Sequence, residues 1–351
     1  MHSLAIRVAS MYPAPVTAIV TWLAFAIPAT ASETITYAGA GGTFQAKLVE
    51  ALLTPAVKLH QAELIQTSFR DVLPALKLEV QSGKPAWDIV QTGADSCASA
   101  SRAGLLEPID YKVVRTDGLP KEAYARDWVS PNYYSFVLAW RNDIFPQGPK
   151  NWADFFDVKR FKGPRALAAF PQGMLEVALL ADGVEPANLY PIDVDRALNK
   201  IRTIKNEISV WWATGAQSAQ LLKDGEVDMM AIWGSRVEAA VQSGAPVSFT
   251  FDHSIINYNC FAIPKGSAHK ELAMRVIAAT LTPEIQANIP KLLPYYGPTN
   301  KEAYRVGLSA GQVEKPSPFR DMQGQAIPMD VQFWAEHLEA IVPRYRAMIA
   351  E

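Results

Sequence analysis

From Glu33 onward the chain repeats one pattern: a short apolar run, a turn of glycine or polar residues, and a segment with apolar residues at helical spacing. Short apolar runs bounded by turn residues are typical of buried strands, and i, i+3, i+4 spacing indicates amphipathic helices. The first unit has a strand at 35–38 and a helix at 44–59, and the second has a strand at 62–67 and a helix at 72–82. This alternation predicts an α/β fold with a mostly parallel sheet and helices on both faces.

The alternation continues along most of the remaining chain. Further strands are expected at 87–90, 135–140, 165–170, 229–233, 247–251 and 258–263, and helices at 152–156, 174–182, 191–205, 216–223 and in much of the chain after 270. The character changes around Pro146, Gly148 and Pro149, and 351 residues are long for a single core. We therefore expect two domains.

Residues 227–236 contain a strand-to-helix turn with unusual side chains. Residues 229–233 read as a buried strand, and Ser235 with Glu238 three positions later fits a capping box, so a helix is expected from Arg236. Trp233 and Arg236 then lie at the carboxyl end of a strand, where open α/β sheets bind ligands. The alternative is that Trp233 packs in the core and Arg236 is a solvated first-turn residue.

Three other turns, at 39–44, 91–96 and 170–174, share this position between a strand and a helix. Free N–H groups and the positive dipole at a helix start favour anionic or carbonyl oxygens. If the four turns face one cleft, they form a site for a small ligand.

The first 31 residues differ from all that follow. They contain no acidic residue, carry an apolar stretch at 16–27 and end in Ala29-Thr30-Ala31, the small-x-small pattern of signal-peptidase sites. The apolar stretch is shorter than the roughly 20 residues that a membrane-spanning helix needs, and no cysteine lies near the site. We expect cleavage after Ala31 and a mature periplasmic chain that begins at Ser32.

Composition excludes one class of partner. The chain has 33 Lys and Arg against 35 Asp and Glu, a net charge of −2, and no dense basic run. Nucleic acid is therefore not an expected partner.

Export to an oxidising compartment draws attention to the two cysteines, Cys97 and Cys260. A disulfide requires Cα atoms within about 7 Å of each other, which the spacing along the chain does not determine. A bridge and two buried, unbridged thiols are both open alternatives.

Several motifs occur in a characteristic order. Residues 37–45 combine a strand with Gly41, Gly42, Phe44 and Gln45; residues 87–90 read Trp-Asp-Ile-Val; 223–233 contain a Gly-Glu turn and a strand ending in Trp; 260–266 read Cys-Phe-Ala-Ile-Pro-Lys-Gly; and 273–300 end in Pro-Thr-Asn. In these motifs and their order the chain resembles the periplasmic solute-binding proteins of ABC importers, in particular the spermidine/putrescine receptors. The resemblance covers nearly the whole chain after residue 32.

The resemblance implies a two-lobed periplasmic-binding-protein fold of type II that closes over its ligand by hinge motion. Lobe one would comprise 33–138 with 257–302, and lobe two 141–253 with 304–351, with hinges near 138–141, 253–257 and 302–304. Such a receptor delivers a small-molecule ligand to an inner-membrane ABC permease. It makes and breaks no bond, so neither enzymatic activity nor a cofactor is expected, and we expect a monomer.

Several residues differ from the polyamine-receptor pattern, and these differences bear on the kind of ligand that the protein binds. Acids of that group appear here as Ala40-Gly41, as Gln172, as Arg236 and as Asn259, with Asn257 in place of a frequent Trp. Losing four carboxylates and gaining a guanidinium disfavours a dication, because buried charge needs a partner. Arginine at a helix start is suited to a bidentate grip on a carboxylate. We predict a small organic anion or zwitterion, such as an amino acid-like or aromatic acid.

The expected ligand-binding residues combine Arg236 with hydroxyls, amides and aromatic walls. They are Gly41, Thr43, Phe44, Thr92, Gln172, Trp211, Trp212, Trp233, Arg236, Asn257, Tyr258, Asn259 and Tyr296. Core packing is the alternative for each aromatic residue, and the neighbours Trp211 and Trp212 are not expected to face the cleft together.

Three alternative functions have some basis in the sequence. Polyamine binding is the first alternative within the same fold. Ferric-ion binding is the second, because Tyr133-Tyr134 and Tyr295-Tyr296 are adjacent tyrosines, although neither pair has an obvious His partner. Catalysis is disfavoured because the histidines are scattered and neither a Gly-x-Ser-x-Gly motif nor a Cys/His pair at catalytic spacing occurs.

Overall fold

A computed structural model describes residues 32–293, 295–307 and 326–351. The expected signal peptide and its cleavage site after Ala31 lie outside the described residues. Glu33–Glu351 form one compact unit. In the described ranges, no helix combines the length and the apolar character needed to cross a membrane.

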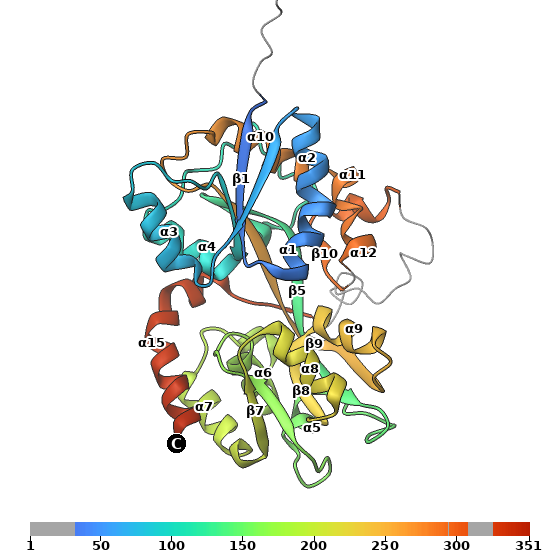
Figure 1. The fold of residues 1–351 in the computed structure, drawn as a ribbon. Coiled ribbons are helices and arrows are strands. Elements are labelled where there is room, and N and C mark those ends of the chain that lie inside the picture. The colour runs from blue at the N-terminus through green and yellow to red at the C-terminus, as the bar shows by residue number, and fades with distance from the viewer. Residues whose placement is uncertain (1–31, 294, 308–325) are drawn as a thin grey trace, which may run out of the picture. The chain divides into compact units, whose positions relative to one another are not determined.

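The described strands form one mixed sheet of eleven strands in which the main order is β2-β1-β3-β9-β5-β8-β6-β7 (Figure 1). The strands of this path are β1 (Thr34–Gly39), β2 (Glu63–Ser68), β3 (Ile89–Gly93), β5 (Trp128–Arg141), β6 (Arg165–Ala168), β7 (Ile208–Trp212), β8 (Met229–Trp233) and β9 (Val247–Ala262). Short strands β4 (Tyr124–Ala125) and β10 (Gly297–Pro298) pair with β5, and β11 (Ile327–Pro328) pairs with β9. The strands at each end of the path, β2-β1-β3 and β8-β6-β7, are parallel.

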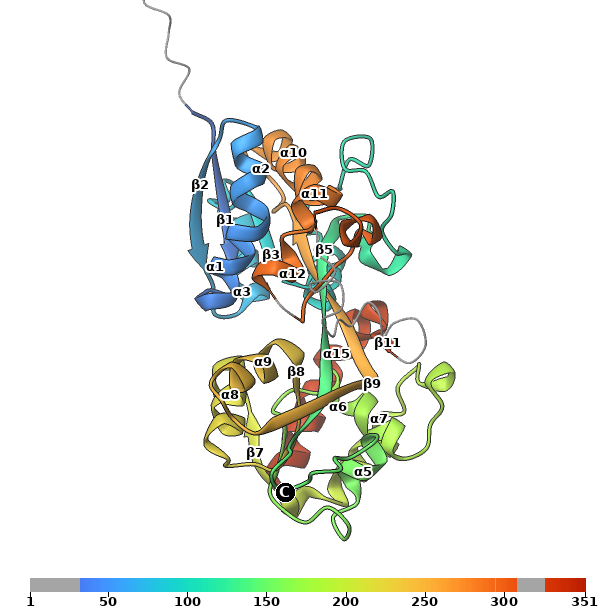
Figure 2. The ribbon, with the colours of Figure 1, turned by 90° about the vertical axis from the view of Figure 1, so that its right-hand side faces the viewer.

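Two long antiparallel strands, β5 and β9, join these ends (Figure 2). The sequence predicted separate strands at 247–251 and 258–263, which is wrong, because a single strand runs from Val247 to Ala262 and includes the polar Asp252-His253 segment. The β5–β9 register shifts between Phe136 and Leu138, and His253 opposite this break has a φ of 51°. The irregularity lies close to the predicted hinges at 138–141 and 253–257, whose motion stays a prediction.

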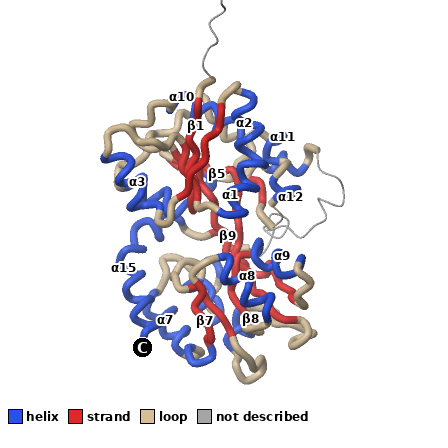
Figure 3. The backbone as a smooth tube through the Cα atoms, in the orientation of Figure 1, coloured by secondary structure: helices blue, strands red, loops and turns tan. Residues whose placement is uncertain are grey.

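Helices surround the strands (Figure 3). The buried apolar side chains form three clusters, and the two around β1, β2 and β3 are together called the first core region. The described helices are α1 (Gly42–Leu48), α2 (Thr54–Leu59), α3 (Val72–Gln81), α4 (Ala94–Arg102), α5 (Trp152–Phe156), α6 (Met174–Ala181), α7 (Val194–Arg202), α8 (Gly215–Asp224), α9 (Gly234–Gln242), α10 (Lys270–Thr280), α11 (Pro283–Gln286), α12 (Ile289–Leu292) and α15 (Val331–Ala350). The helix expected at 44–59 comprises α1, a π-helical segment, Val49–Leu53, and α2. The first core lies around β1, β2 and β3 with α1 to α4 and α10, and the second around β6, β7 and β8 with α5 to α9.

The last helix, α15, contacts both core regions. Near its start, Glu336 forms an ion pair with Arg102 of α4 at 2.9 Å. Towards its end, the buried Tyr345 hydroxyl donates a hydrogen bond to the Ala168 carbonyl of β6 at 2.8 Å. The assignment of 304–351 to lobe two, like the other lobe boundaries, stays a prediction.

A disulfide between Cys97 of α4 and Cys260 of β9 cross-links the first core. The Cα atoms are 6.5 Å apart, within the range that a disulfide allows. Of the two alternatives left open for the cysteines, the bridge is therefore the one that the structure has.

The second core contains a fully buried carboxyl group, that of Glu176 in α6. Its Oε1 accepts hydrogen bonds from the Tyr190 hydroxyl and from the Trp334 indole N–H, each at 2.7 Å. These contacts tie α6 to α15. Burial raises the pKa of Glu176 to about 6 despite the two hydrogen bonds.

We expect Glu176 to make the protein more stable at mildly acidic pH. Because its pKa is raised in the folded state, its contribution is fully present below the ordinary pKa of 4.5 and is lost as the pH rises through about 6. The difference between these two pKa values corresponds to about 2 kcal/mol of unfolding free energy. Urea denaturation of wild type and Glu176→Gln at pH 4.5 and 7 measures it. A wild-type-minus-variant difference that is the same at both pH values would contradict the prediction.

Candidate functional site

The candidate site is built at the carboxyl ends of parallel strands on both sides of β5 and β9. Phe44 follows β1, Asp95 follows β3, Gln172 follows β6, and Trp233 and Arg236 lie at the end of β8. This is the edge at which open α/β sheets bind ligands. The four turns singled out in the sequence are thus the ones that supply these side chains.

The turn after β8 differs from the sequence prediction in one respect. Helix α9 begins at Gly234 and has no side-chain cap, so the predicted capping box at Ser235 is wrong. Ser235 lies inside the first turn, and its hydroxyl donates a hydrogen bond to the Tyr296 hydroxyl at 3.2 Å. This bond joins α9 to the segment after α12.

Trp233 forms one wall of the site together with other aromatic rings. It stacks on Phe170 with ring centroids 5.8 Å apart and meets Trp212 edge-on at 4.9 Å. Phe136 completes the group at 5.7 Å from Trp233. Gly173, with a φ of 81°, allows the turn after β6 to approach Phe136, since a Cβ there would lie 2.7 Å from the ring. Phe136 and the predicted site residue Trp212 are fully buried in the second core, so only Trp233 and Phe170 are partly exposed and can supply the apolar surface that ligand pockets usually have.

Two predicted aromatic residues lie away from this wall. Side chains alternate along β7, so Trp212 joins Trp233 while Trp211 packs edge-on against Tyr345 of α15. Tyr258 is buried in the first core against Tyr133. Both have structural packing partners, and we leave them out of the proposed site.

Arg236 lines a cavity of about 390 Å³ whose walls come from α1, α9, α12 and Tyr296. On the opposite wall, Phe44 and Tyr296 stack with ring centroids 4.9 Å apart. Thr43 also lines the cavity, and the Gly41 N–H that precedes α1 donates to Gln45 Oε1 at 2.8 Å. Burial raises the pKa of Tyr296, and the Ser235 hydrogen bond and the Arg236 guanidinium act in the opposite direction.

The Arg236 side chain lies against Gly215, the first residue of α8, where any Cβ would overlap Nε. We therefore expect Gly215→Ala to displace the guanidinium and to weaken binding of any ligand that Arg236 contacts roughly tenfold, the loss of one charge-assisted hydrogen bond. Isothermal titration calorimetry measures the change. Gly234→Ala is the matched control, because its Cβ would meet neighbours only at ordinary distances, 3.6 Å or more. Equal affinities of the two variants would contradict the prediction.

A buried polar cluster connects the two sides of the cleft. Asp95 of α4 accepts hydrogen bonds from Gln172 Nε2 and Asn257 Nδ2, each at 3.2 Å. Asn257 Nδ2 also lies 3.0 Å from the Tyr134 hydroxyl. Burial raises the pKa of Tyr134 well above its ordinary value, and the Asp95 carboxylate adds to the rise. Gln172 belongs to the second core region and Asp95 to the first, so this hydrogen bond crosses between them.

A second polar chain runs along the sheet from β1 to β9. The Tyr37 hydroxyl donates to Gln91 Oε1 at 3.3 Å, and Gln91 Nε2 donates to Asn259 Oδ1 at 3.0 Å. Thr92, the next residue of β3, is half-buried and lies opposite Cys260 in the β3–β9 register. These two hydrogen bonds fix the position of the Asn259 carboxamide.

Several buried polar atoms near the cleft have no hydrogen-bond partner among the described residues. They include Ser135 Oγ, Trp233 Nε1, Arg236 Nε and Asn259 Nδ2. Buried polar groups are nearly always paired in folded proteins, with protein or with bound molecules. The three N–H groups among them can donate only, which favours a ligand with acceptor oxygens.

The structure thus brings together most of the predicted site residues around the Arg236 cavity, the aromatic wall and the polar cluster. Sequence reasoning missed Asp95, Tyr134, Phe136, Phe170, Gly215 and Ser235. Asp95 and Phe170 lie within the turns at 91–96 and 170–174 that the pattern did single out. Tyr134 and Phe136 gave no signal beyond strand-like character.

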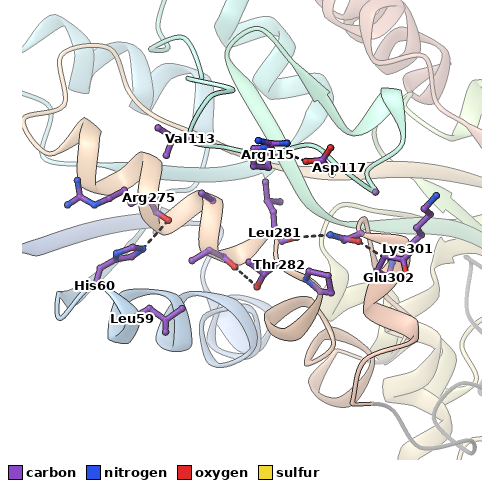
Figure 4. Close-up of a pocket in the computed structure, with 15 residues that line it drawn as sticks. Leu59, His60, Val113, Arg115, Asp117, Arg275, Leu281, Thr282, Lys301 and Glu302 are labelled. Carbon is purple, nitrogen blue, oxygen red and sulfur yellow. Dashed lines mark hydrogen bonds and ion pairs between the residues drawn. The ribbon is translucent and has the colours of Figure 1, made fainter.

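A larger cavity of about 690 Å³ lies elsewhere, between α2, α10, α11 and residues 113–118 (Figure 4). Its polar groups engage one another: Arg115 pairs with Asp117 at 3.0 Å, a ring nitrogen of His60 lies 3.2 Å from the Arg275 carbonyl, and Asn300 donates to the Leu281 carbonyl at 3.0 Å. None of the predicted site residues lines it. The smaller cavity at the strand ends is therefore the candidate site.

Comparison with known proteins places this geometry in a family. The model of the bacterial extracellular solute-binding protein family matches residues 61–316. The gamma-aminobutyric acid-binding protein of Pseudomonas aeruginosa is 30% identical over 93% of this chain and 94% of its own length. The spermidine/putrescine-binding periplasmic protein of Escherichia coli is 22% identical over 64% of this chain and 66% of its own length.

Among solved structures, an ABC transporter substrate-binding protein from Bradyrhizobium japonicum is 38% identical, with a TM-score of 0.86 over 90% of this chain and 99% of that one. The two-lobed α/β fold expected from the sequence motifs is confirmed by this similarity. Members of the family are receptors and not enzymes. The chain belongs to the bacterial extracellular solute-binding proteins, the receptors that bring small molecules to ABC transporters.

Proposed function

We propose that this receptor captures a small organic anion or zwitterion, amino acid-like or aromatic, and that Arg236 holds its carboxylate. The observation that carries the proposal is the buried Nε of Arg236, which has no partner among the described residues, in a cavity at the strand ends. A guanidinium offers donors in a fork that matches a carboxylate, and no acidic side chain in the described ranges forms an ion pair with Arg236.

Two further observations support this ligand class. The partly exposed rings of Trp233 and Phe170, which lie at the ends of neighbouring strands, suit the apolar part of a small ligand. The relative from Pseudomonas aeruginosa that aligns over almost the whole chain is named for gamma-aminobutyric acid, a compound with one carboxylate and one amine.

Binding of ferric ion receives no support from the tyrosine pairs. Tyr133 packs on Tyr258 while Tyr134 reaches Asn257, and Tyr295 packs on Phe249 while Tyr296 stacks on Phe44. Each pair therefore diverges instead of converging on one ion.

The same proposal includes the export, the location and the oligomeric state of the receptor. The chain is exported, cleaved after Ala31, and acts in the periplasm as a monomer that closes at its hinges and delivers the ligand to an inner-membrane permease. Mass spectrometry of the periplasmic protein, which should begin at Ser32, and light scattering in solution test the cleavage and the monomeric state.

A thermal-shift screen with amines, amino acids and organic acids tests the ligand class. A compound that binds the folded state raises the melting temperature, and we expect carboxylate-bearing compounds to do so. If only putrescine-like diamines raise it, the polyamine alternative holds and the role of Arg236 is overturned.

A further inference from the structure

We infer that Tyr295 and Tyr296 form a latch between the two core regions, which keeps the cleft closed in the ligand-free protein and so sets how tightly a ligand is held. The inference rests on the hinge closure in the proposed function and is independent of the ligand's identity. It starts from an unusual feature: two adjacent side chains, in the segment after α12, pack against different core regions.

Tyr296 contacts both walls of the Arg236 cavity. Its ring stacks on Phe44 with centroids 4.9 Å apart, and both rings pack against the first core region. Its hydroxyl accepts a hydrogen bond at 3.2 Å from Ser235, which lies in the first turn of α9 in the second core region. Ser235 and Tyr296 both line the cavity. The walls of the cavity therefore separate only if this hydrogen bond breaks.

Tyr295 packs on the second core region. Its ring meets Phe249 edge-on with centroids 5.3 Å apart and lies 6.4 Å from Phe251, and both partners are in β9. The backbone of Tyr295 has a φ of 66°, a conformation that residues other than glycine rarely adopt. Such a conformation persists only where the surrounding contacts fix it. The contacts of Tyr295 with the second core region therefore hold this segment in place.

A further hydrogen bond joins the two core regions at other strand ends. Gln172, in the turn after β6, donates to Asp95 of α4 at 3.2 Å. Side chains thus tie the two regions together at two places, in addition to the long strands β5 and β9. A latch of this kind strengthens ligand binding, because the measured dissociation constant is the intrinsic one divided by the fraction of protein in the closed, binding-competent form.

The test is the distance between two spin labels in the ligand-free protein, measured by double electron–electron resonance. Labels attached at Leu78→Cys on α3 and Lys223→Cys on α8 report on the separation of the core regions, since both positions are exposed. The two native cysteines are disulfide-bonded and take up no label. With the latch intact, we expect one dominant, short distance.

The double variant Tyr295→Ala, Tyr296→Phe removes the Phe249 contact and the Ser235 hydrogen bond and keeps the Phe44 stack. Loss of one hydrogen bond raises the ratio of open to closed protein about two- to tenfold, and loss of the aromatic contact adds a similar factor. We expect the double variant to gain a population at longer distance. Tyr296→Phe alone, the mildest change, should give a smaller gain.

Two further variants serve as references. Tyr111→Phe is the matched control, because the Tyr111 hydroxyl also donates to backbone carbonyls, among them that of Trp128 at 3.2 Å, but within the first core region. We expect it to leave the distance unchanged. Ser235→Trp is a wedge: its bulky ring between α9 and Tyr296 should open the cleft whatever contacts hold it closed.

The outcomes separate the latch from the hinge closure on which it rests. If the wedge lengthens the distance and the double variant does not, the latch is overturned and the hinge closure stands. If neither lengthens it, both are overturned. A shift of equal size in Tyr111→Phe also overturns the latch. The role of Arg236 is independent of these outcomes, because it is tested by ligand binding.

Discussion

Replacing Arg236 by alanine is expected to abolish measurable binding of the carboxylate ligand and to leave the fold intact. Truncating one member of a buried, hydrogen-bonded charge pair costs roughly 2–5 kcal/mol of binding free energy, which weakens binding at least about 30-fold. The fold should tolerate the change because the Arg236 side chain forms no ion pair in the described ranges and leaves its Nε unpaired.

The measurement is calorimetric titration with the carboxylate that raises the melting temperature most in the ligand screen. Arg202→Ala is the control, because Arg202 is an exposed arginine paired with Glu351 at 2.7 Å at the end of α7, away from the strand ends that carry the site. We expect it to bind as wild type does. A variant Arg236→Ala that retains wild-type affinity would sink the proposed role, provided that its circular dichroism spectrum is unchanged.

Removing the disulfide is expected to have the largest effect on stability. Cys97 and Cys260 are separated by 163 residues, and a cross-link over so long a loop restricts the unfolded chain strongly. The loop-entropy relation gives about 5 kcal/mol, and the loss of native disulfides typically costs about 2–5 kcal/mol. We therefore expect the double variant Cys97→Ala, Cys260→Ala to unfold at a clearly lower urea concentration.

Reduction supplies the matched control for this prediction. Wild-type protein treated with dithiothreitol should unfold at nearly the same urea concentration as the double variant, and the variant itself should not respond to the reductant. Two titratable thiols in the oxidised wild-type protein, or an unchanged urea midpoint in the double variant, would show that the bridge does not stabilise the fold.

Much of the fold could be predicted because its strands are short, buried and bounded by turn residues. The strand 229–233 and the helix 152–156 have the predicted limits, and most other elements differ from them by a few residues. The exceptions are β7, which was not predicted, β5, which begins seven residues before the predicted strand at 135–140, and β9, where the polar Asp252-His253 pair interrupts the apolar pattern within one strand. Hydrophobic patterning reports burial, and a strand that crosses between two cores changes its burial along the way.

The candidate site was predictable in position but not in full composition. Arg236 and Trp233 could be singled out because their residue types are unusual at a strand-to-helix turn. Asp95 could not, since an acid in the first turn of a helix is ordinary, and only the amides of Gln172 and Asn257 around it reveal its burial. The direction of Trp211, away from the site, required the register of β7 in the sheet.

The two long strands have a consequence for how such a receptor changes its ligand. Because β5 and β9 each contribute residues to both core regions, neither region can be excised or exchanged as a module without cutting central strands of the other. A new specificity in this scaffold must therefore arise by replacing side chains at the strand ends, one turn at a time. On the proposed function, the ligand preference depends on the side chains of those few turns. The turns belong to one scaffold because β5 and β9 are shared by both core regions.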